Sequence, residues 1–146
     1  MGASCSNACT SAEAKDLEPI EVTYFDMGYG RADPIVQMLV HSGVKYTYHG
    51  ETFETWGARK KAGKTGEFGA LPIIKKGNRT LDLSIPSLRS LGMELGYYPI
   101  NDYKMAATVD MVTETYSEVF DKWAGIIFAQ DKNDAEKAEA FSESLK

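Results

Sequence analysis

Between Ile20 and Pro99 the sequence alternates between strand-like and helix-like segments, and this order limits the possible folds more than any other feature. Residues 20–25 alternate apolar and polar side chains and are rich in β-branched and aromatic residues, which predicts a strand. Together with this strand, similar patterns predict strands at residues 45–49, 71–75 and 80–82. Helices are predicted at residues 33–43, between the first two strands, and at residues 84–95, after the last strand. A loop rich in Gly and Lys is expected at residues 57–69. This βαβ and then ββα order predicts an α/β domain of about 80 residues.

The ends of the predicted helices carry their own signals. Asp33-Pro34 predicts a helix start with proline at the first position, and Gly43 predicts the end of that helix. Ser84 is predicted to cap the next helix, because a serine side chain accepts a hydrogen bond from a free backbone N–H group there.

Residues 102–130 predict a long amphipathic helix. Its apolar side chains recur every three or four residues, at Met105, Val109, Val112, Tyr116, Val119, Trp123 and Ile126. Asp134 is predicted to cap a second helix over residues 135–146. Two helices alone leave a wide apolar stripe uncovered, so we expect either a partner that covers it or further residues after Lys146.

Composition and charge exclude several classes of function. The 146 residues are 43% apolar and 25% charged, which is typical of a globular chain, and no apolar run predicts a membrane span. A net charge of −5 argues against a nucleic-acid partner, since phosphate binding needs clustered Lys and Arg. No apolar signal segment opens the sequence, so a cytoplasmic location is expected. His41 and His49 lack partners at ligand spacing, and no metal site is predicted.

Six motifs follow one another in an order that is more specific than any one of them. They are Thr23-Tyr24-Phe25, Gly30-Arg31-Ala32-Asp33-Pro34, Trp56 with Lys60, Phe68-Gly69-Ala70-Leu71-Pro72-Ile73, Ser84 through Leu91, and Val109 through Thr115. With these residues the chain resembles a glutathione transferase, closest to the sigma class and its prostaglandin-isomerase relatives. The resemblance implies a thioredoxin-like glutathione-binding domain at residues 20–99. It also implies that an all-helical domain follows at residues 100–146 and is cut short.

The resemblance assigns catalysis to Tyr24 and Arg31. A cysteine thiol such as that of glutathione has a pKa of about 8.5, and its thiolate is the nucleophile. A hydroxyl aimed at the sulfur lowers that pKa because it hydrogen-bonds the charged form. Tyr24, expected to point over the sheet edge, matches the family's catalytic tyrosine, and Arg31 matches an arginine that supports it electrostatically. A core tyrosine and a surface arginine at a helix terminus are the alternatives.

The resemblance also implies where the glutathione tripeptide binds. In this fold Pro72 follows a cis peptide bond, which leaves the backbone N–H and C=O of Leu71 to pair with the cysteinyl backbone. Ser84 binds the γ-glutamyl carboxylate at a helix N-terminus, where free N–H groups favour an anion. Leu83 stands where the family has a glutamine that bonds the same glutamyl group. An edge-strand proline and a serine that only caps its helix are the alternatives.

Three further residues match ligand-binding positions of the family. Trp56 and Lys60, both expected on a loop, match residues that reach the glycine end of glutathione. Glu118 matches an acidic residue that crosses the dimer to the glutamyl amine. Packing and solvated charge are the alternatives for these side chains. The implied partners are glutathione as co-substrate, a small electrophilic or lipid-derived substrate, and a second copy of the chain; no other cofactor is expected.

Two functions remain open at this point. In the first, Tyr24 stabilises the glutathione thiolate for attack on an electrophile or for isomerisation of a lipid peroxide. In the second, the chain is a truncated, non-catalytic family member that acts as a membrane-tethered binding or scaffold module. Leu83 and the shortened helical domain favour the second function, whereas Tyr24, Arg31 and Pro72 favour the first.

Residues 1–19 are small, polar and without periodic apolar positions, which predicts a flexible tail. The tail begins with the pattern M-G-x-x-x-[ST], the acceptor for myristoylation of Gly2. One acyl chain anchors a protein only weakly, so Cys5 and Cys9 are candidate palmitoylation sites that supply a second signal. A chance match to a loose pattern is the alternative. A membrane anchor is therefore a second expectation beside a freely cytoplasmic protein.

Overall fold

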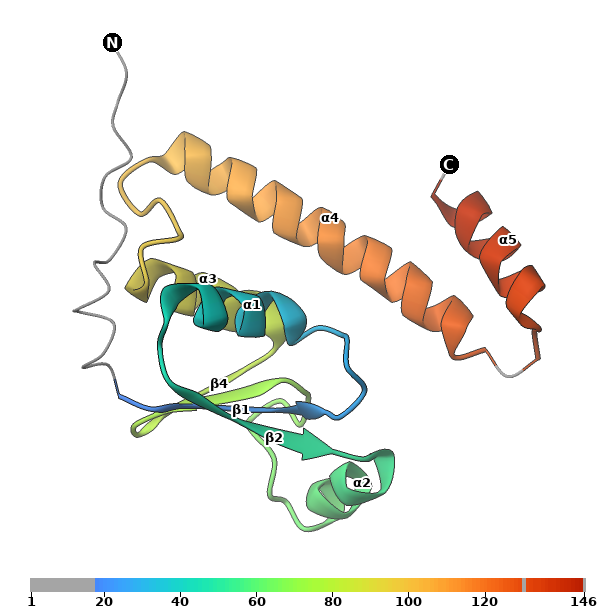
Figure 1. Cartoon of the computed structure of the whole chain (residues 1–146), viewed down its shortest axis with the longest axis horizontal. Helices are drawn as coiled ribbons and strands as arrows, with labels where there is room; N and C mark the ends of the chain where they lie inside the picture. The colour runs from blue at the N-terminus through green and yellow to red at the C-terminus, as the bar shows by residue number, and fades with distance from the viewer. Residues whose placement is uncertain (1–17, 130, 146) are drawn as a thin grey trace. The chain divides into compact units, whose positions relative to one another are not determined.

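The computed structural model describes residues 18–129 and 131–145. Within these ranges the elements are β1 (Ile20–Phe25), α1 (Asp33–Ser42), β2 (Tyr46–Glu51), α2 (Phe53–Lys61), β3 (Ile73–Lys76), β4 (Arg79–Asp82), α3 (Ser84–Glu94), α4 (Tyr103–Ile127) and α5 (Asp134–Ser144). Figure 1 shows their arrangement. The α/β prediction is confirmed, since a strand-and-helix domain precedes two further helices.

The strands form one mixed sheet in the order β2-β1-β3-β4. β1 runs parallel to β2, with Tyr24 opposite Gly50. β3 runs antiparallel to β1 and to β4. Because Thr23 lies opposite Ile73, the end of β1 is beside the start of β3. This register brings Tyr24 close in the sheet to the Leu71-Pro72 segment that precedes β3.

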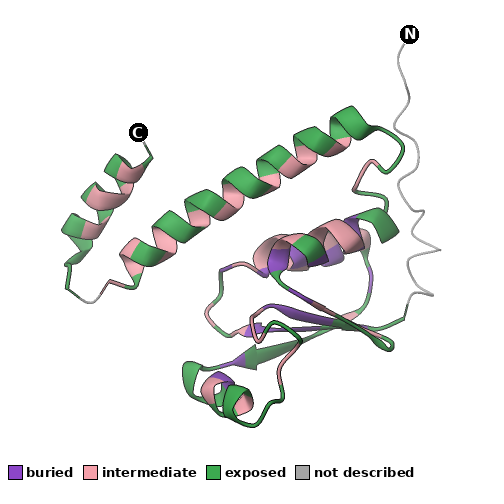
Figure 2. Ribbon diagram, turned by 180° about the vertical axis from the view of Figure 1, so that it is seen from behind, coloured by how far each residue is buried: buried purple, intermediate pink, exposed green. Residues whose placement is uncertain are grey.

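The hydrophobic core lies on the face of the sheet that α1 and α3 cover (Figure 1). Its buried members are Ile20, Val22, Tyr24, Ala32, Ile35, Leu39, Val44, Ile74, Leu91 and Leu95. Figure 2 shows that the buried residues are concentrated in the sheet and in these two helices. Full burial of one large aliphatic side chain is worth about 1.5–3 kcal/mol, so this cluster is the main source of stability in the α/β part.

α2 lies on the opposite face of the sheet, beside the end of β2 (Figure 1). The predicted loop is wrong in its first part, since the helix continues to Lys61. Thr52 and Thr55 form a capping box, in which each hydroxyl accepts the backbone N–H of the other residue at 3.1 and 2.9 Å. Only Trp56 is buried in this helix, so its sequence lacks the repeated apolar spacing that indicates a helix.

Two of the predicted helix caps are wrong. α3 begins with Ser84 itself, and Leu83 occupies the N-cap position with φ 67° and ψ 141°. α5 begins at Asp134, and its N-cap is Asn133, whose side chain accepts two backbone N–H groups of the first turn at 3.1 Å. The side chain of Glu136 accepts the Asn133 backbone N–H in return. An asparagine one residue earlier therefore caps the helix in place of Asp134, and it does so within a capping box.

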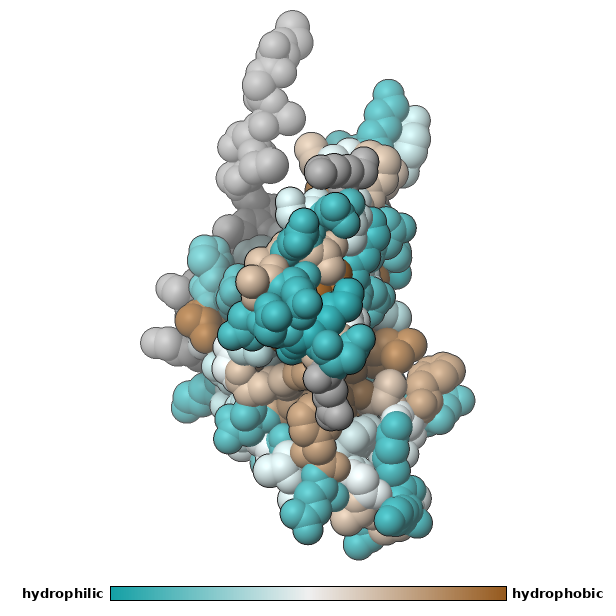
Figure 3. All heavy atoms as spheres, turned by 90° about the vertical axis from the view of Figure 1, so that its right-hand side faces the viewer, coloured by the Kyte–Doolittle hydropathy of each residue, from teal (hydrophilic) through white to brown (hydrophobic). Residues whose placement is uncertain are grey.

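The chain divides into two compact units after Ala106, inside α4. No residue of α4 or α5 is buried. Along the second unit, aromatic ring centroids follow one another at 6.1, 5.3 and 6.3 Å, from Tyr116 through Phe120 and Trp123 to Phe128. Hydrophilic side chains cover most of α5 in Figure 3. No helix within the described ranges is long and apolar enough to cross a membrane.

Candidate functional site

Tyr24, near the end of β1, is the centre of the candidate site. Its side chain packs into the core, with 6% of the residue surface exposed. Its phenol oxygen accepts a hydrogen bond from the backbone N–H of Arg31 at 3.0 Å. This bond uses a lone pair of the oxygen and leaves the phenol proton for another acceptor. The ring lies in the core, and not over the sheet edge as predicted, because Tyr24 shares one face of β1 with Ile20 and Val22.

The turn between β1 and α1 is built closely around this ring. Gly30 has φ +148°, and a Cβ atom at this position would lie 2.6 Å from both Cε1 and the hydroxyl oxygen of Tyr24. The Gly30 backbone N–H donates to the Asp33 carboxylate at 2.8 Å, which fixes the turn to the first residue of α1. The absence of a side chain at Gly30 therefore allows the backbone to reach the phenol, and Arg31 N–H follows directly.

The surroundings of Tyr24 keep its phenol protonated. Burial raises the pKa of Tyr24 above its ordinary value, and this effect outweighs the Arg31 N–H bond and the Arg31 charge, which lower the pKa. The carboxylate of Asp33 adds to the increase. Because an ordinary tyrosine pKa is about 10, Tyr24 is a neutral hydrogen-bond donor at physiological pH.

The segment before β3 passes beside the end of β1. The Leu71-Pro72 peptide bond is cis, as the resemblance implies. Pro72 is buried, Leu71 is half-buried, and β3 begins at the next residue. Within the described part of the chain, the backbone N–H and C=O of Leu71 have no hydrogen-bond partner. The structure thus leaves one donor and one acceptor of the main chain for an extended ligand.

Leu83 and Ser84 connect β4 to α3. Ser84 is buried and stands at the first position of the helix, where backbone N–H groups lack helical partners. Leu83 is 38% exposed and has φ 67°, a backbone conformation that costs a residue other than glycine about 1–3 kcal/mol. A strained residue beside a helix N-terminus is the kind of local irregularity that is found at ligand sites.

Trp56 and Lys60 lie on α2 and not on the loop where they were predicted. Trp56 is buried, and the Lys60 ammonium nitrogen lies 5.6 Å from the centroid of its ring. The helical spacing of four residues brings the two side chains together. Glu118 is an exposed residue of α4 in the second unit, and its ligand role stays a prediction. The predicted lipidation sites Gly2, Cys5 and Cys9 lie outside the described residues.

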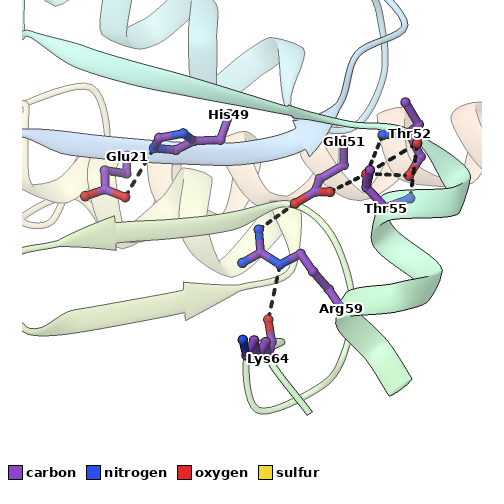
Figure 4. A network of polar contacts seen from close by, with 7 residues as sticks. All are labelled: Glu21, His49, Glu51, Thr52, Thr55, Arg59 and Lys64. Carbon is purple, nitrogen blue, oxygen red and sulfur yellow. Dashed lines mark hydrogen bonds and ion pairs between the residues drawn. The ribbon is translucent and has the colours of Figure 1, made fainter. Parts of the chain in front are cut away.

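A polar network fixes α2 to the end of β2 (Figure 4). The buried carboxylate of Glu51 accepts hydrogen bonds from the Thr55 hydroxyl at 2.6 Å and from the Arg59 guanidinium at 2.5 Å. Arg59 also donates to the backbone carbonyl of Lys64 at 3.2 Å, and so ties the following loop to the same carboxylate. These bonds lower the pKa of Glu51, the Thr55 hydroxyl having the largest effect. The helix that carries Trp56 is thereby held in place by charge-assisted bonds.

Sequence reasoning missed Gly30, Asp33 and Tyr48 as neighbours of Tyr24. Gly30 and Asp33 belong to a motif that was recognised, so only the close approach of Gly30 to the phenol and the electrostatic effect of Asp33 on it were missed. The Tyr48 hydroxyl donates to the backbone carbonyl of Phe25 at 2.8 Å, and burial raises its pKa. No sequence signal points to Tyr48, since the parallel pairing of β2 with β1 is what brings it near. No cluster of three or more His, Cys, Asp or Glu that could hold a metal occurs in residues 18–129 and 131–145.

Comparison with known proteins agrees with this geometry. The chain is 32% identical over 114 residues to glutathione S-transferase P of Macaca mulatta and, with the same figures, of Homo sapiens; the overlap is 77% of this chain and 52% of each relative. The solved structure of NaGST-2 is 26% identical, with a TM-score of 0.70 over 85% of this chain and 58% of that chain. The chain belongs to the glutathione S-transferase family.

The glutathione S-transferase fold also extends to more distant relatives. Prostaglandin synthase D of Nilaparvata lugens superposes with a TM-score of 0.68 at 21% identity, over 87% of this chain and 60% of that chain, which is a likeness of fold alone. No family model matches the chain. The chain spans about half the length of the curated glutathione S-transferases it matches, 52% in each case. The thioredoxin-like domain followed by helices that was predicted is therefore the observed fold.

Proposed function

We propose that this protein binds glutathione and uses Tyr24 to stabilise the glutathione thiolate. The supporting observation is the Arg31 N–H bond to the phenol oxygen, which orients the hydroxyl while its proton remains available. A neutral phenol whose pKa is raised can donate to a thiolate without losing its own proton. The charge of Arg31 acts on the same group and favours an anion beside the phenol.

The tripeptide would lie across the ends of β1 and β3. The backbone of Leu71 pairs with the cysteinyl residue as an added strand does, and Ser84 with the first N–H groups of α3 receives the γ-glutamyl carboxylate. Trp56 and Lys60 on α2 face the glycine end in this arrangement. Leu83 offers no polar side chain to the glutamyl group, which lowers affinity by about 1–3 kcal/mol relative to a glutamine that forms this bond.

The reaction we propose is nucleophilic attack by the thiolate on a small electrophile. The thiol proton passes to solvent, a bond forms between sulfur and the electrophilic carbon, and the leaving group departs with its electron pair. Isomerisation of a lipid peroxide, the activity typical of sigma-class relatives, is the finer alternative within the same site. A second copy of the chain, with Glu118 reaching the glutamyl amine of its partner, belongs to the same proposal.

Isothermal titration with glutathione, combined with conjugation kinetics, tests the proposal. Tyr24→Phe keeps the ring and removes the hydroxyl, so we expect kcat/KM to fall about 100-fold while the dissociation constant of glutathione changes by less than about threefold. Tyr103→Phe is the control, because Tyr103 is 80% exposed on α4. Unchanged kinetics in Tyr24→Phe would contradict the assignment of catalysis to Tyr24, and absence of saturable binding to the wild type would contradict the proposal as a whole.

Two observations favour a second function, a cytoplasmic binding module tethered to a membrane. Leu83 removes a polar contact for the ligand, and the sequence at Gly2, Cys5 and Cys9 fits a double acylation signal. The mass of the N-terminal peptide of protein isolated from its own cells tests this function. An increase by one myristoyl group, with no turnover of electrophiles, supports the module; an unmodified peptide refutes it.

A further inference from the structure

Asp82, the last residue of β4, is a buried carboxylate that the proposed function does not use. It is 9% exposed, and its Oδ2 atom accepts a hydrogen bond from the backbone N–H of Phe68 at 2.9 Å. Its Oδ1 atom is buried and, among the described residues, has no hydrogen-bond partner. A buried carboxylate oxygen without a partner lowers stability, which indicates that the Asp82 side chain has a role that compensates for this cost.

The second oxygen of Asp82 is packed against Gly66. A Cβ atom at Gly66 would lie 1.8 Å from Oδ1 and 2.1 Å from Oδ2, so only glycine fits beneath this carboxylate. Two residues after Gly66, the backbone N–H of Phe68 donates its hydrogen bond to the same carboxylate. The carboxylate thus contacts the loop of residues 65–69 at two points, one by a hydrogen bond and one by close packing.

These contacts join the two segments that would hold glutathione. Only Ala70 separates the loop from Leu71-Pro72, and Asp82 is directly followed by Leu83 and Ser84. The sheet register places Ile73, which follows the cis proline, opposite Asp82. β3 begins at Ile73 and β4 ends at Asp82. Beyond this pair, no further ladder bond between described residues fixes the loop against the start of α3. The Asp82 carboxylate provides a connection at this point.

We propose that Asp82 is a positioning residue of the glutathione site, which sets the distance between the Leu71 backbone and Ser84. It acts through the loop of residues 65–69 and does not touch the ligand. This inference rests on the proposed function, because the two segments matter together only if one ligand spans them. The bond to Phe68 orders the loop before the ligand arrives, and pre-ordering increases affinity because less conformational freedom is lost on binding.

The test compares glutathione binding by isothermal titration in the wild type, Asp82→Ala and Asp82→Asn. Asp82→Ala removes both contacts, and we expect the dissociation constant to rise about tenfold or more. Asp82→Asn keeps an oxygen acceptor for Phe68 N–H, so affinity should stay within about threefold of the wild type. Asp102→Ala is the matched control, since the Asp102 carboxylate accepts two backbone N–H groups at 3.1 Å at the start of α4.

A double-mutant cycle separates positioning from general stability. Ser84→Ala raises the dissociation constant of glutathione by some factor in the wild type. If Asp82 places Ser84 relative to Leu71, this factor should be at least about fivefold smaller in the Asp82→Ala background. Additive effects in this cycle, or an Asp82→Ala variant that binds as the wild type does, would overturn the inference. Wild-type protein that binds no glutathione would overturn the proposed function together with it, so the two failures are distinguishable.

Hydrogen exchange adds a readout that does not depend on glutathione. In Asp82→Ala, and not in Asp102→Ala, the amide of Phe68 should exchange faster while the amides of the β1–β3 ladder keep their protection. Wild-type exchange at Phe68 as fast as that of an unprotected amide would show that the carboxylate does not hold the loop. That result would overturn the inference even if Asp82→Ala binds glutathione weakly.

Discussion

The two compact units of the chain bury their apolar side chains to very different extents. In the first unit a sheet faces two helices, and side chains such as Ile35, Leu39 and Leu91 are fully buried. In the second unit the long helix α4 is amphipathic, yet Met111 and Val112 are 63% and 66% exposed. Regular apolar spacing is thus present in both units, whereas among the described residues a buried core forms only in the first unit.

The difference follows from the geometry of the elements. A sheet offers a broad face, and two helices laid across it can surround a side chain on all sides. Two helices share only one line of contact, so side chains beside that line remain accessible. Apolar periodicity therefore indicates which face of a helix is to be covered, and the neighbouring elements determine how far it is covered.

Truncation of the core should separate the units most clearly. Leu91→Ala creates a cavity in the first unit, and we expect it to lower the free energy of unfolding by about 2–5 kcal/mol. Val112→Ala, at an exposed position of α4, should change it by less than about 0.5 kcal/mol. Denaturation in urea measures both. A loss above 2 kcal/mol for Val112→Ala would show that the exposed stripe of α4 is covered in solution.

Alanine substitution of two glycines is expected to change stability in opposite directions. Gly30→Ala brings a Cβ atom to 2.6 Å from the Tyr24 ring, so it should cost about 1–3 kcal/mol of stability and reduce turnover. Gly125 lies within α4, and a Cβ atom there meets nothing within 4 Å. Gly125→Ala should therefore stabilise the chain by about 0.5–1 kcal/mol. Thermal unfolding of both variants checks the signs, and a stabilised Gly30→Ala would contradict the tight turn around Tyr24.

Ser87 tests whether an unpaired buried hydroxyl lowers the stability of the first unit. Its hydroxyl is fully buried in α3 and has no partner among the described residues. Ser87→Ala should raise the free energy of unfolding by about 1 kcal/mol, because an unpaired buried hydroxyl is removed. Ser90→Ala is the control, since the Ser90 hydroxyl accepts a bond from Arg79 at 2.9 Å. A destabilised Ser87→Ala would mean that a water molecule or another group satisfies this hydroxyl.

One helix in each unit begins with a capping box, and this pair tests whether the units unfold together. Thr52→Ala in α2 and Asn133→Ala in α5 each remove a cap, at a cost of about 1 kcal/mol. If the chain unfolds in one transition, both variants should shift the same midpoint in circular dichroism. If Asn133→Ala shifts only an early phase of helix loss, the second unit unfolds separately.

The smallest effect is expected from pH and belongs to the first unit. Hydrogen bonds from Thr55 and Arg59 lower the pKa of Glu51, so its folded pKa lies below the unfolded value of about 4.3. The stability it adds is fully present above the unfolded pKa and is lost as pH falls through the folded pKa. Glu51→Gln should flatten this part of the profile in unfolding experiments between about pH 7 and about pH 3. An unchanged slope would exclude Glu51 as its source.

Much of the α/β unit could be predicted from the sequence because its signals are local. The alternation in residues 20–25, the proline at position 34 and the glycine at position 43 each depend on backbone and side-chain preferences of a few neighbours. The predictions that were wrong also concern local structure. α2 buries only Trp56, so its sequence shows no repeated apolar spacing. The N-cap of α3 is the strained Leu83 and not Ser84, which no residue propensity predicts.

The sequence by itself determined the order of the elements apart from α2, the family and the identity of Tyr24 as the candidate catalytic residue. The tertiary structure decided how these residues meet. The Arg31 N–H reaches the phenol only because Gly30 lacks a side chain, and the Asp82 carboxylate reaches Gly66 and Phe68 only because the end of β4 lies beside that loop. Such contacts depend on strand register and on close approach of backbones, and these arise when distant segments pack together.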